Sequence, residues 1–195
     1  MKLYLSTIGI AMLLISVFNV VFDMETWYYV VIAVTFCTAL QFALDGTIAF
    51  VINKLPDGWF GVGNALYRVS KAERELYKKL KVRLWKDKVW ELGGLGGFSK
   101  KKLREPNDQK YIEKFIVECN KGVLTHRLSY PIGFLAMLFF SNACSFTIAL
   151  PVALVNLVLN VLPTMALRYN TPMLTMILER MKRQETVRIS ANNKR

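Results

Sequence analysis

Long runs of apolar residues alternate with strongly basic segments along this chain of 195 residues. Four apolar stretches are close to the roughly 20 residues that a helix needs to cross about 30 Å of hydrocarbon. They are Leu3–Phe22, Trp27–Val51, Val123–Phe140 and Phe146–Leu167. The pattern predicts an all-α integral membrane protein with four transmembrane helices and amphipathic interfacial helices on the cytoplasmic side.

The first two apolar stretches are predicted to remain in the membrane as a helical pair. The first is longer than the apolar core of a cleavable signal peptide, and no small-residue cleavage site follows it. The second opens with Trp27, Tyr28 and Tyr29, which are typical of an aromatic belt at a membrane interface.

The segment between the second and third stretches alternates between apolar and basic positions with a helical period. Leu76, Leu80 and Leu84 recur at four-residue steps among lysines and arginines, which predicts an amphipathic helix over 71–90 lying in the membrane plane. A second helix is expected from Asn107 or Asp108 to about Asn120, with a break or kink at Gly122 before His126.

These patterns divide the chain into four segments. Residues 1–53 contain spans one and two, and 54–122 form a basic cytoplasmic or interfacial helical segment. Residues 123–167 contain spans three and four, and 168–195 form an interfacial helix, Met173–Met181, followed by a disordered basic tail.

Charge fixes the expected orientation of the spans. Hydrophobic residues make up 53% of the chain, yet its net charge is +12. Lys54–Tyr130 carries 18 Lys or Arg residues and Arg168–Arg195 carries 7, while the loop after span one has only Asp23 and Glu25. The positive-inside rule then places both termini in the cytoplasm.

Several functional classes are disfavoured by the sequence. The three cysteines have no obvious pairing partners, and one histidine without a CxxC pair argues against a metal site. The break Gly93–Lys102 lacks the spacing of a phosphate-binding loop. Because spans flank the basic segment, anionic membrane lipid is the expected partner and nucleic acid is not.

Two ionisable residues lie in or beside predicted spans. His126 is the only histidine and sits where the basic segment meets span three, so it is either a catalytic group or a polar cap beside Arg127. Asp45 is the only acid inside a predicted span, and it is either functional or an interfacial partner of a lysine or a helix end.

Several motifs in the C-terminal two thirds of the chain resemble one family. They are Leu55–Phe60 (LPDGWF), Leu84–Lys88 (LWKDK), Glu118 with His126 eight residues later, and Asn160 eight residues before Arg168–Arg183 (RYNTPMLTMILERMKR). In this order and spacing they resemble the glycosyl-4,4'-diaponeurosporenoate acyltransferases, which include the small membrane enzyme that completes staphyloxanthin.

The resemblance implies transfer of a fatty acyl group from an acyl thioester to a hydroxyl of a glycosylated lipid or terpenoid in a bacterial cell membrane. Acyl-CoA or acyl carrier protein is the expected co-substrate, with no bound cofactor. Such a transfer needs a base for the hydroxyl and a donor for the developing oxyanion. His126 is the expected base and Glu118 a candidate for orienting it, although eight residues of unbroken helix would separate the two by about 12 Å. The predicted substrate-binding residues are Arg168, Asn170, Asn160, Trp85, Lys86 and Asp57.

Other readings remain open at this point. The HxxxxD motif of glycerolipid acyltransferases is absent, since Pro131 lies five residues after His126. A non-enzymatic lipid-binding or assembly protein would use His126 and Arg168 structurally. A transporter would need Asp45, Asn156 and Asn160 to line a path, which four spans without a visible repeat disfavour. The acceptor, the acyl chain length and the oligomeric state are open, and a homodimer is compatible with four thin spans.

Overall fold

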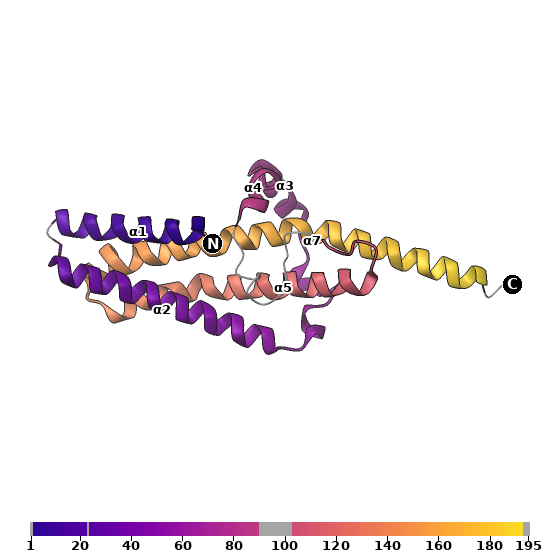
Figure 1. Cartoon of the computed structure of the whole chain (residues 1–195), viewed down its shortest axis with the longest axis horizontal. Helices are drawn as coiled ribbons and strands as arrows, with labels where there is room; N and C mark the ends of the chain where they lie inside the picture. The colour runs from indigo at the N-terminus through magenta and orange to yellow at the C-terminus, as the bar shows by residue number, and fades with distance from the viewer. Residues whose placement is uncertain (1, 23, 90–102, 193–195) are drawn as a thin grey trace. The chain divides into compact units, whose positions relative to one another are not determined.

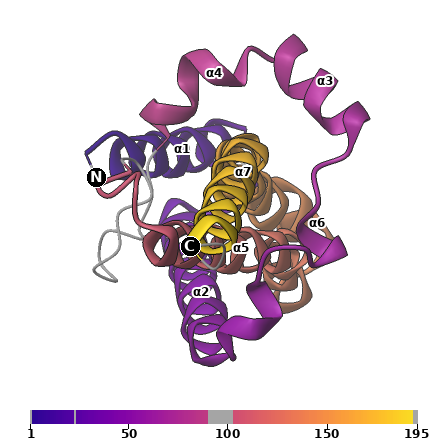
Figure 2. The same ribbon diagram turned by 90° about the vertical axis from the view of Figure 1, so that its right-hand side faces the viewer.

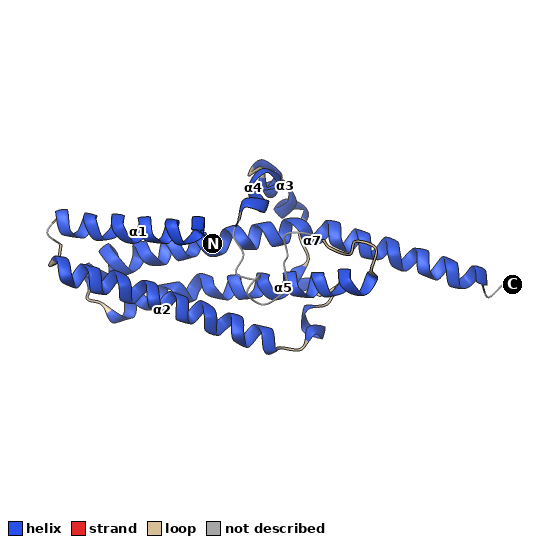
Figure 3. Ribbon diagram, viewed as in Figure 1, coloured by secondary structure: helices blue, strands red, loops and turns tan. Residues whose placement is uncertain are grey.

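The structure is a computed structural model that describes residues 2–22, 24–89 and 103–192. Within these ranges it consists of helices and connecting loops, as Figure 3 shows. The chain divides into two compact units. Unit 1 comprises 1–54 and 124–163, and unit 2 comprises 55–123 and 164–195.

Unit 1 is built from two long helices and parts of two others. Helix α1 covers Lys2–Val21 and α2 covers Trp27–Lys54. The C-terminal part of α5 (Gln109–Ile132) leads into a 3-10 segment, η5 (Gly133–Phe139). The short α6 (Asn142–Cys144) and a π-helical turn, η6 (Ser145–Ala149), then open α7 (Leu150–Asn192). Helices α1 and α2, which are labelled in Figure 1, contact each other, and both contact η6.

Three of the described helices are long and apolar enough to cross a membrane. They are Tyr4–Val21, Trp27–Lys54 and Ser145–Asn192, and they correspond to the predicted spans one, two and four. The predicted span Val123–Phe140 is not among them, because it is divided between α5 and the 3-10 segment η5. Pro131 removes one backbone donor from the last turn of α5, which favours a change of helix type there.

The interior of unit 1 combines small apolar residues with buried amides. Its core includes Val34 and Cys37 of α2 together with Ile148 and Ala149 of η6. Asn19 is fully buried, and its Nδ2 donates to the carbonyls of Ile15 at 2.8 Å and Thr147 at 2.9 Å. Hydrogen bonds from a side-chain amide, such as the one to Thr147, commonly join membrane helices without a buried charge.

Unit 2 begins with short helical turns rather than one long helix. The 3-10 turns η1 (Asp57–Phe60) and η2 (Ala65–Tyr67) precede α3 (Lys71–Lys79). Ser70 caps α3, since its side chain accepts from the N–H of Glu73 at 3.1 Å.

The predicted helix over 71–90 is interrupted. After α3 the backbone turns at Lys81, whose φ is +50°, and continues as α4 (Val82–Trp85) and η3 (Lys86–Lys88). The turn lets Tyr77 and Val82 pack on the same small core with Val69. Leu76, Leu80 and Leu84 are exposed, and their contact with a membrane surface stays a prediction.

Two predicted helix boundaries are wrong, and Figure 2 shows the helices concerned nearly end-on. Helix α5 continues through Gly122, and α7 continues through Pro172 to Asn192, so 173–181 is not a separate helix and the tail is helical at least to 192. Near Pro172 the hydroxyl of Thr171 donates to the carbonyl of Leu167 at 3.1 Å, which supports the local backbone. The predicted break Gly93–Lys102 lies outside the described residues.

Candidate active site

Three polar residues of unit 1, predicted separately, are joined by hydrogen bonds. Nδ1 of His126 lies 2.7 Å from Oδ1 of Asn160. Nδ2 of Asn160 lies 3.3 Å from Oδ2 of Asp45 and also approaches Asn156, at 3.0 Å from its carbonyl and 3.1 Å from its Oδ1. We call Asp45, Asn160 and His126 the amide relay. It brings residues of α2, α7 and α5 to one place.

The neighbours of Asn160 determine which way its amide points. All three oxygens around Nδ2 are acceptors, so the nitrogen must face them and Oδ1 must face His126. A carboxamide oxygen only accepts, and Nδ1 of the imidazole therefore carries the proton in this contact. In the neutral ring Nε2 is then the basic nitrogen.

This arrangement suits general-base chemistry. When Nε2 takes a proton, the ring becomes positive and its Nδ1–H bond to Asn160 becomes stronger. The Asp45 carboxylate, on the far side of the same amide, orients Asn160 and favours a positive ring through it. A histidine positioned by an asparagine amide also operates in papain-like proteases, on an unrelated fold.

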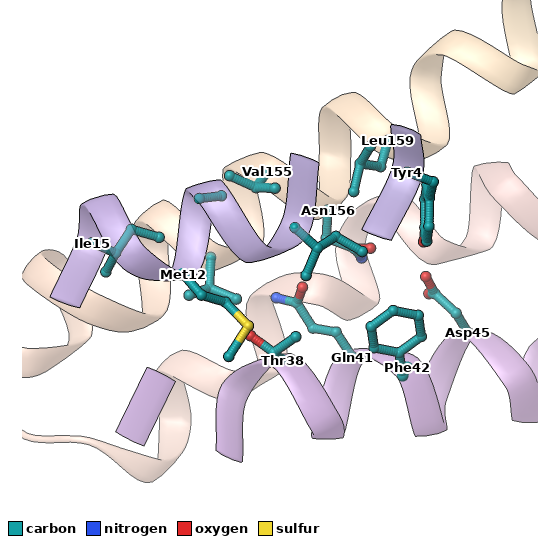
Figure 4. A pocket seen from close by; sticks show the side chains of 13 residues that line it. Tyr4, Met12, Ile15, Thr38, Gln41, Phe42, Asp45, Val155, Asn156 and Leu159 are labelled. Carbon is teal, nitrogen blue, oxygen red and sulfur yellow. The ribbon is translucent and has the colours of Figure 1, made fainter. Parts of the chain in front are cut away.

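A narrow apolar pocket borders the relay. It is lined by residues of α1, α2 and α7 and encloses about 30 Å³, room for about two water molecules. In Figure 4, Tyr4 and Asp45 face each other at one end, while Met12 and Ile15 lie toward the other.

Two buried polar atoms at this pocket have no partner among the described residues. They are Oδ1 of Asp45, an acceptor, and Nδ2 of Asn156, a donor. Asn156 is only 6% exposed, and an unpaired buried donor costs about 1–3 kcal/mol. Unpaired groups of this kind are typical of sites that bind a polar ligand or water.

Glu118 is not positioned by a bend toward His126. The contact would require a break near Gly122, and α5 is continuous from Gln109 to Ile132. Eight helical residues advance about 12 Å, and residues eight apart lie too far along one helix for a direct hydrogen bond. The hydrogen-bond partner of Nδ1 of His126 is Oδ1 of Asn160 instead.

Arg168, a predicted substrate ligand, is engaged in an ion pair of unit 2. It is 4% exposed; its Nε donates to Oε1 of Glu73 and its Nη2 donates to Oε2 at 2.6 Å. The carbonyls of Tyr67 and Arg68 accept from its other donors at 3.4 and 3.1 Å. These bonds join α7 to α3 and to the loop before it, so Arg168 has a structural task whether or not it also meets substrate.

Tyr77 completes this cluster. Its hydroxyl donates to Oε1 of Glu73, and its ring belongs to the small core of unit 2. Burial raises the pKa of the Tyr77 hydroxyl, and the Glu73 carboxylate raises it further.

The other predicted substrate ligands all lie in unit 2. Asp57 is exposed and accepts from Nζ of the buried Lys121 at 2.5 Å. Nε1 of Trp85 donates to the carbonyl of Leu80 at 3.0 Å, and Lys86 pairs with the neighbouring Asp87 at 2.7 Å. Asn170 is partly buried on α7. Their roles in substrate binding stay predictions.

Sequence reasoning missed Glu73 and Lys121, the partners of two predicted ligands. Both read as ordinary members of a highly charged segment, since nothing local shows which charges will be buried. It also singled out Asp45 without connecting it to His126. In the sequence, Asp45 is recognisable only as a lone acid in an apolar span, and His126 only as a lone histidine at the end of a span.

Comparison with known proteins identifies the family. A model of the glycosyl-4,4'-diaponeurosporenoate acyltransferase family matches residues 56–180. The match includes His126 and Asn160, while Asp45 precedes it. Neither the curated proteins nor the solved structures gave a significant match. Because the matched range covers more than half of the chain, the protein belongs to the glycosyl-4,4'-diaponeurosporenoate acyltransferase family, a family of acyltransferases.

Proposed function

We propose that the protein transfers a fatty acyl group from an acyl thioester to a hydroxyl of a glycosylated lipid or terpenoid at the cytoplasmic face of the membrane. The family points to an acyltransferase of carotenoid biosynthesis. The observation that supports the chemical step is the amide relay, in which Asn160 accepts from Nδ1 of His126 and leaves Nε2 as the base.

The reaction follows from these roles. Nε2 of His126 takes the proton of the acceptor hydroxyl as its oxygen attacks the thioester carbonyl. A C–O bond forms, the C–S bond breaks, and the imidazolium returns its proton to the departing thiolate. Asn160 and Asp45 hold the ring and favour its charged form. Nδ2 of Asn156, buried without a partner beside Asn160, is our candidate donor to the developing oxyanion.

The proposed membrane arrangement has four crossings with both termini in the cytoplasm. Residues 124–132 of α5 rise about 14 Å, and the seven residues of η5 rise about 14 Å as a 3-10 helix. Together they approach the roughly 30 Å of a bilayer core, so this composite segment is long enough for a third crossing. Such a topology places the basic segments on one side, where anionic lipids would bind them.

The test is acyl transfer by the full-length protein in lipid nanodiscs. A labelled acyl thioester and extracted glycosylated lipids are supplied, and products are identified by mass spectrometry. Wild type should label a glycosylated lipid, and His126→Gln should reduce kcat by about 10²–10⁴-fold while the protein remains folded.

Lys110→Gln, on the exposed first turn of α5, is the matched control and should retain activity. If His126→Gln kept kcat within threefold of wild type, His126 would not be the general base. Identical bound lipid in wild type and variant, with no labelled product from either, would instead favour lipid binding without catalysis.

A further inference from the structure

Unit 2 contains a second, larger cavity that the proposed chemistry does not use. It encloses about 490 Å³, within the range of about 300–1,000 Å³ that is usual for small-molecule sites. The loop after η1, the start of α3, one side of α5 and residues 171–179 of α7 line it. Every lining residue lies within the range matched by the family model, so the cavity is formed from the part of the chain that defines the family.

A buried acceptor at this cavity has no partner. Asn120 is 2% exposed, and its Nδ2 donates to the carbonyl of Phe60 at 2.8 Å. That bond fixes the amide, and its Oδ1 remains unpaired among the described residues. Since a buried carbonyl oxygen is costly to leave unpaired, a bound N–H or O–H donor would stabilise it.

Two arginines give the cavity a positive character. Arg68 and Arg74 both line it, and no ion pair of the described residues engages either guanidinium. The neighbouring carboxylate of Glu73 is occupied by Arg168, so it does not neutralise them. Guanidinium groups are well suited to bidentate binding of phosphate. Glu179 is the one acid in the lining and adds an acceptor.

We infer that this cavity binds the 4'-phosphopantetheine arm of the acyl donor, with the phosphate on Arg68 and Arg74 and an amide N–H on Oδ1 of Asn120. This inference rests on the proposed acyl transfer. Both coenzyme A and acyl carrier protein carry this arm, which combines an anionic phosphate with amide N–H donors. An uncharged sugar would satisfy Asn120 but would leave the two arginines with Glu179 as the one carboxylate in the lining.

The test is direct binding, which requires no turnover. Coenzyme A, 4'-phosphopantetheine and phosphate-free pantetheine are titrated by calorimetry against full-length protein in nanodiscs of zwitterionic lipid. We expect the first two to bind and pantetheine to bind at least tenfold more weakly. Arg68→Gln and Arg74→Gln should each weaken 4'-phosphopantetheine about tenfold, and Arg83→Gln, an exposed arginine outside the lining, should not.

A filling variant gives an independent readout. Met176 lines the cavity and is 63% exposed, so Met176→Trp should fold and should obstruct the ligand. Loss of coenzyme A binding in this variant supports the inference. Equal binding of pantetheine and 4'-phosphopantetheine, or binding unaffected by both arginine variants, overturns it.

The two proposals can fail separately. If wild type transfers label but the arginine variants raise only the KM for the glycosylated acceptor, the cavity is an acceptor site and this inference is wrong while the function stands. If coenzyme A binds with the expected arginine dependence but no acceptor is labelled, the cavity assignment stands and the acyl-transfer proposal fails. Tighter binding of coenzyme A than of the bare arm would identify it, rather than a carrier protein, as the source.

Discussion

The two units bury polar side chains in different ways. In unit 2 the buried charges are paired: Arg168 with Glu73, and Lys121 with Asp57. In unit 1 the buried polar groups are amides and hydroxyls, and Asp45 is the carboxylate that accompanies them. Burying an isolated charge in hydrocarbon costs far more free energy than burying an amide. This cost explains why unit 1, which holds the apolar helices, buries mainly amides and hydroxyls.

The difference separates ion pairs, which have a structural role, from amides, whose unpaired atoms can meet a ligand. An ion pair that is complete within the protein has little capacity left for a ligand. A chain of amides leaves single atoms unpaired, as at Asn156, and these atoms can serve a substrate. We therefore expect substitutions in the Arg168 pair to change stability, and substitutions in the amide relay to change rate.

The largest effect is expected from Glu73→Ala. It leaves the guanidinium of Arg168 buried without its carboxylate, and breaking a buried pair from one side typically costs about 3–5 kcal/mol. The measurement is denaturant unfolding in mixed micelles. Lys78→Met breaks an exposed pair, with side chains 71% and 61% exposed, and should change stability by less than about 1 kcal/mol. If Glu73→Ala kept full stability but lost activity, Arg168 would have a role in the reaction rather than in the stability of the fold.

The next effect concerns Asn160. Asn160→Leu removes the acceptor of the Nδ1 proton, and kcat should fall about 10–100-fold with little change in KM, since a hydrogen bond to a charged group contributes about 1.5–3 kcal/mol. His126 is the only histidine, so its ring gives a single set of ¹⁵N NMR signals. These should report a proton on Nδ1 in wild type and a shift of the proton toward Nε2 in the variant. If the His126 ring kept the same tautomer in the variant, Asn160 would not determine which ring nitrogen carries the proton.

The sequence could predict the apolar helices because hydropathy acts over whole spans. The first two spans and the apolar part of α7 agree with the runs in the sequence. Shorter features depended on local geometry that composition does not encode. The left-handed backbone at Lys81 divides α3 from α4, and the helix through Pro172 continues because tertiary packing overrides a local breaker.

The three residues of the amide relay stand out in the sequence, but the hydrogen bonds that join them do not. His126, Asn160 and Asp45 each differ from their surroundings, but 34 residues separate the first pair and 115 the second. Only helix packing brings them together. Glu118 is predicted from the family-like motif that pairs it with His126, and the continuity of α5 prevents a bend between the two residues.

A smaller effect tests how closely Asn156 is packed beside the amide relay. A Cβ added at Gly133 would lie 3.0 Å from Nδ2 of Asn156, so Gly133→Ala must displace that side chain by a few tenths of an ångström. We expect kcat to fall by about threefold to tenfold if the donor is catalytically positioned. Gly46→Ala, where a Cβ meets nothing within 4 Å on α2, should keep activity. Equal activity of both variants would show that the position of Asn156 does not limit the rate.

The smallest effect belongs to unit 2 and is driven by pH. Because burial and Glu73 raise the pKa of Tyr77 in the folded protein, the folded state holds this proton at a pH where the unfolded chain has released it. Its stabilisation is complete below the ordinary tyrosine value of about 10 and is lost as pH rises beyond it. Between pH 10 and 11, unfolding free energy should fall by about 1 kcal/mol more in wild type than in Tyr77→Phe. Tyrosinate absorbance gives the same answer, since Tyr77 should ionise only with unfolding. Parallel stability profiles for the two proteins would mean that the Glu73 cluster is open to solvent, and the contrast between the closed ion pair of Arg168 and the unpaired amides of unit 1 would then be lost.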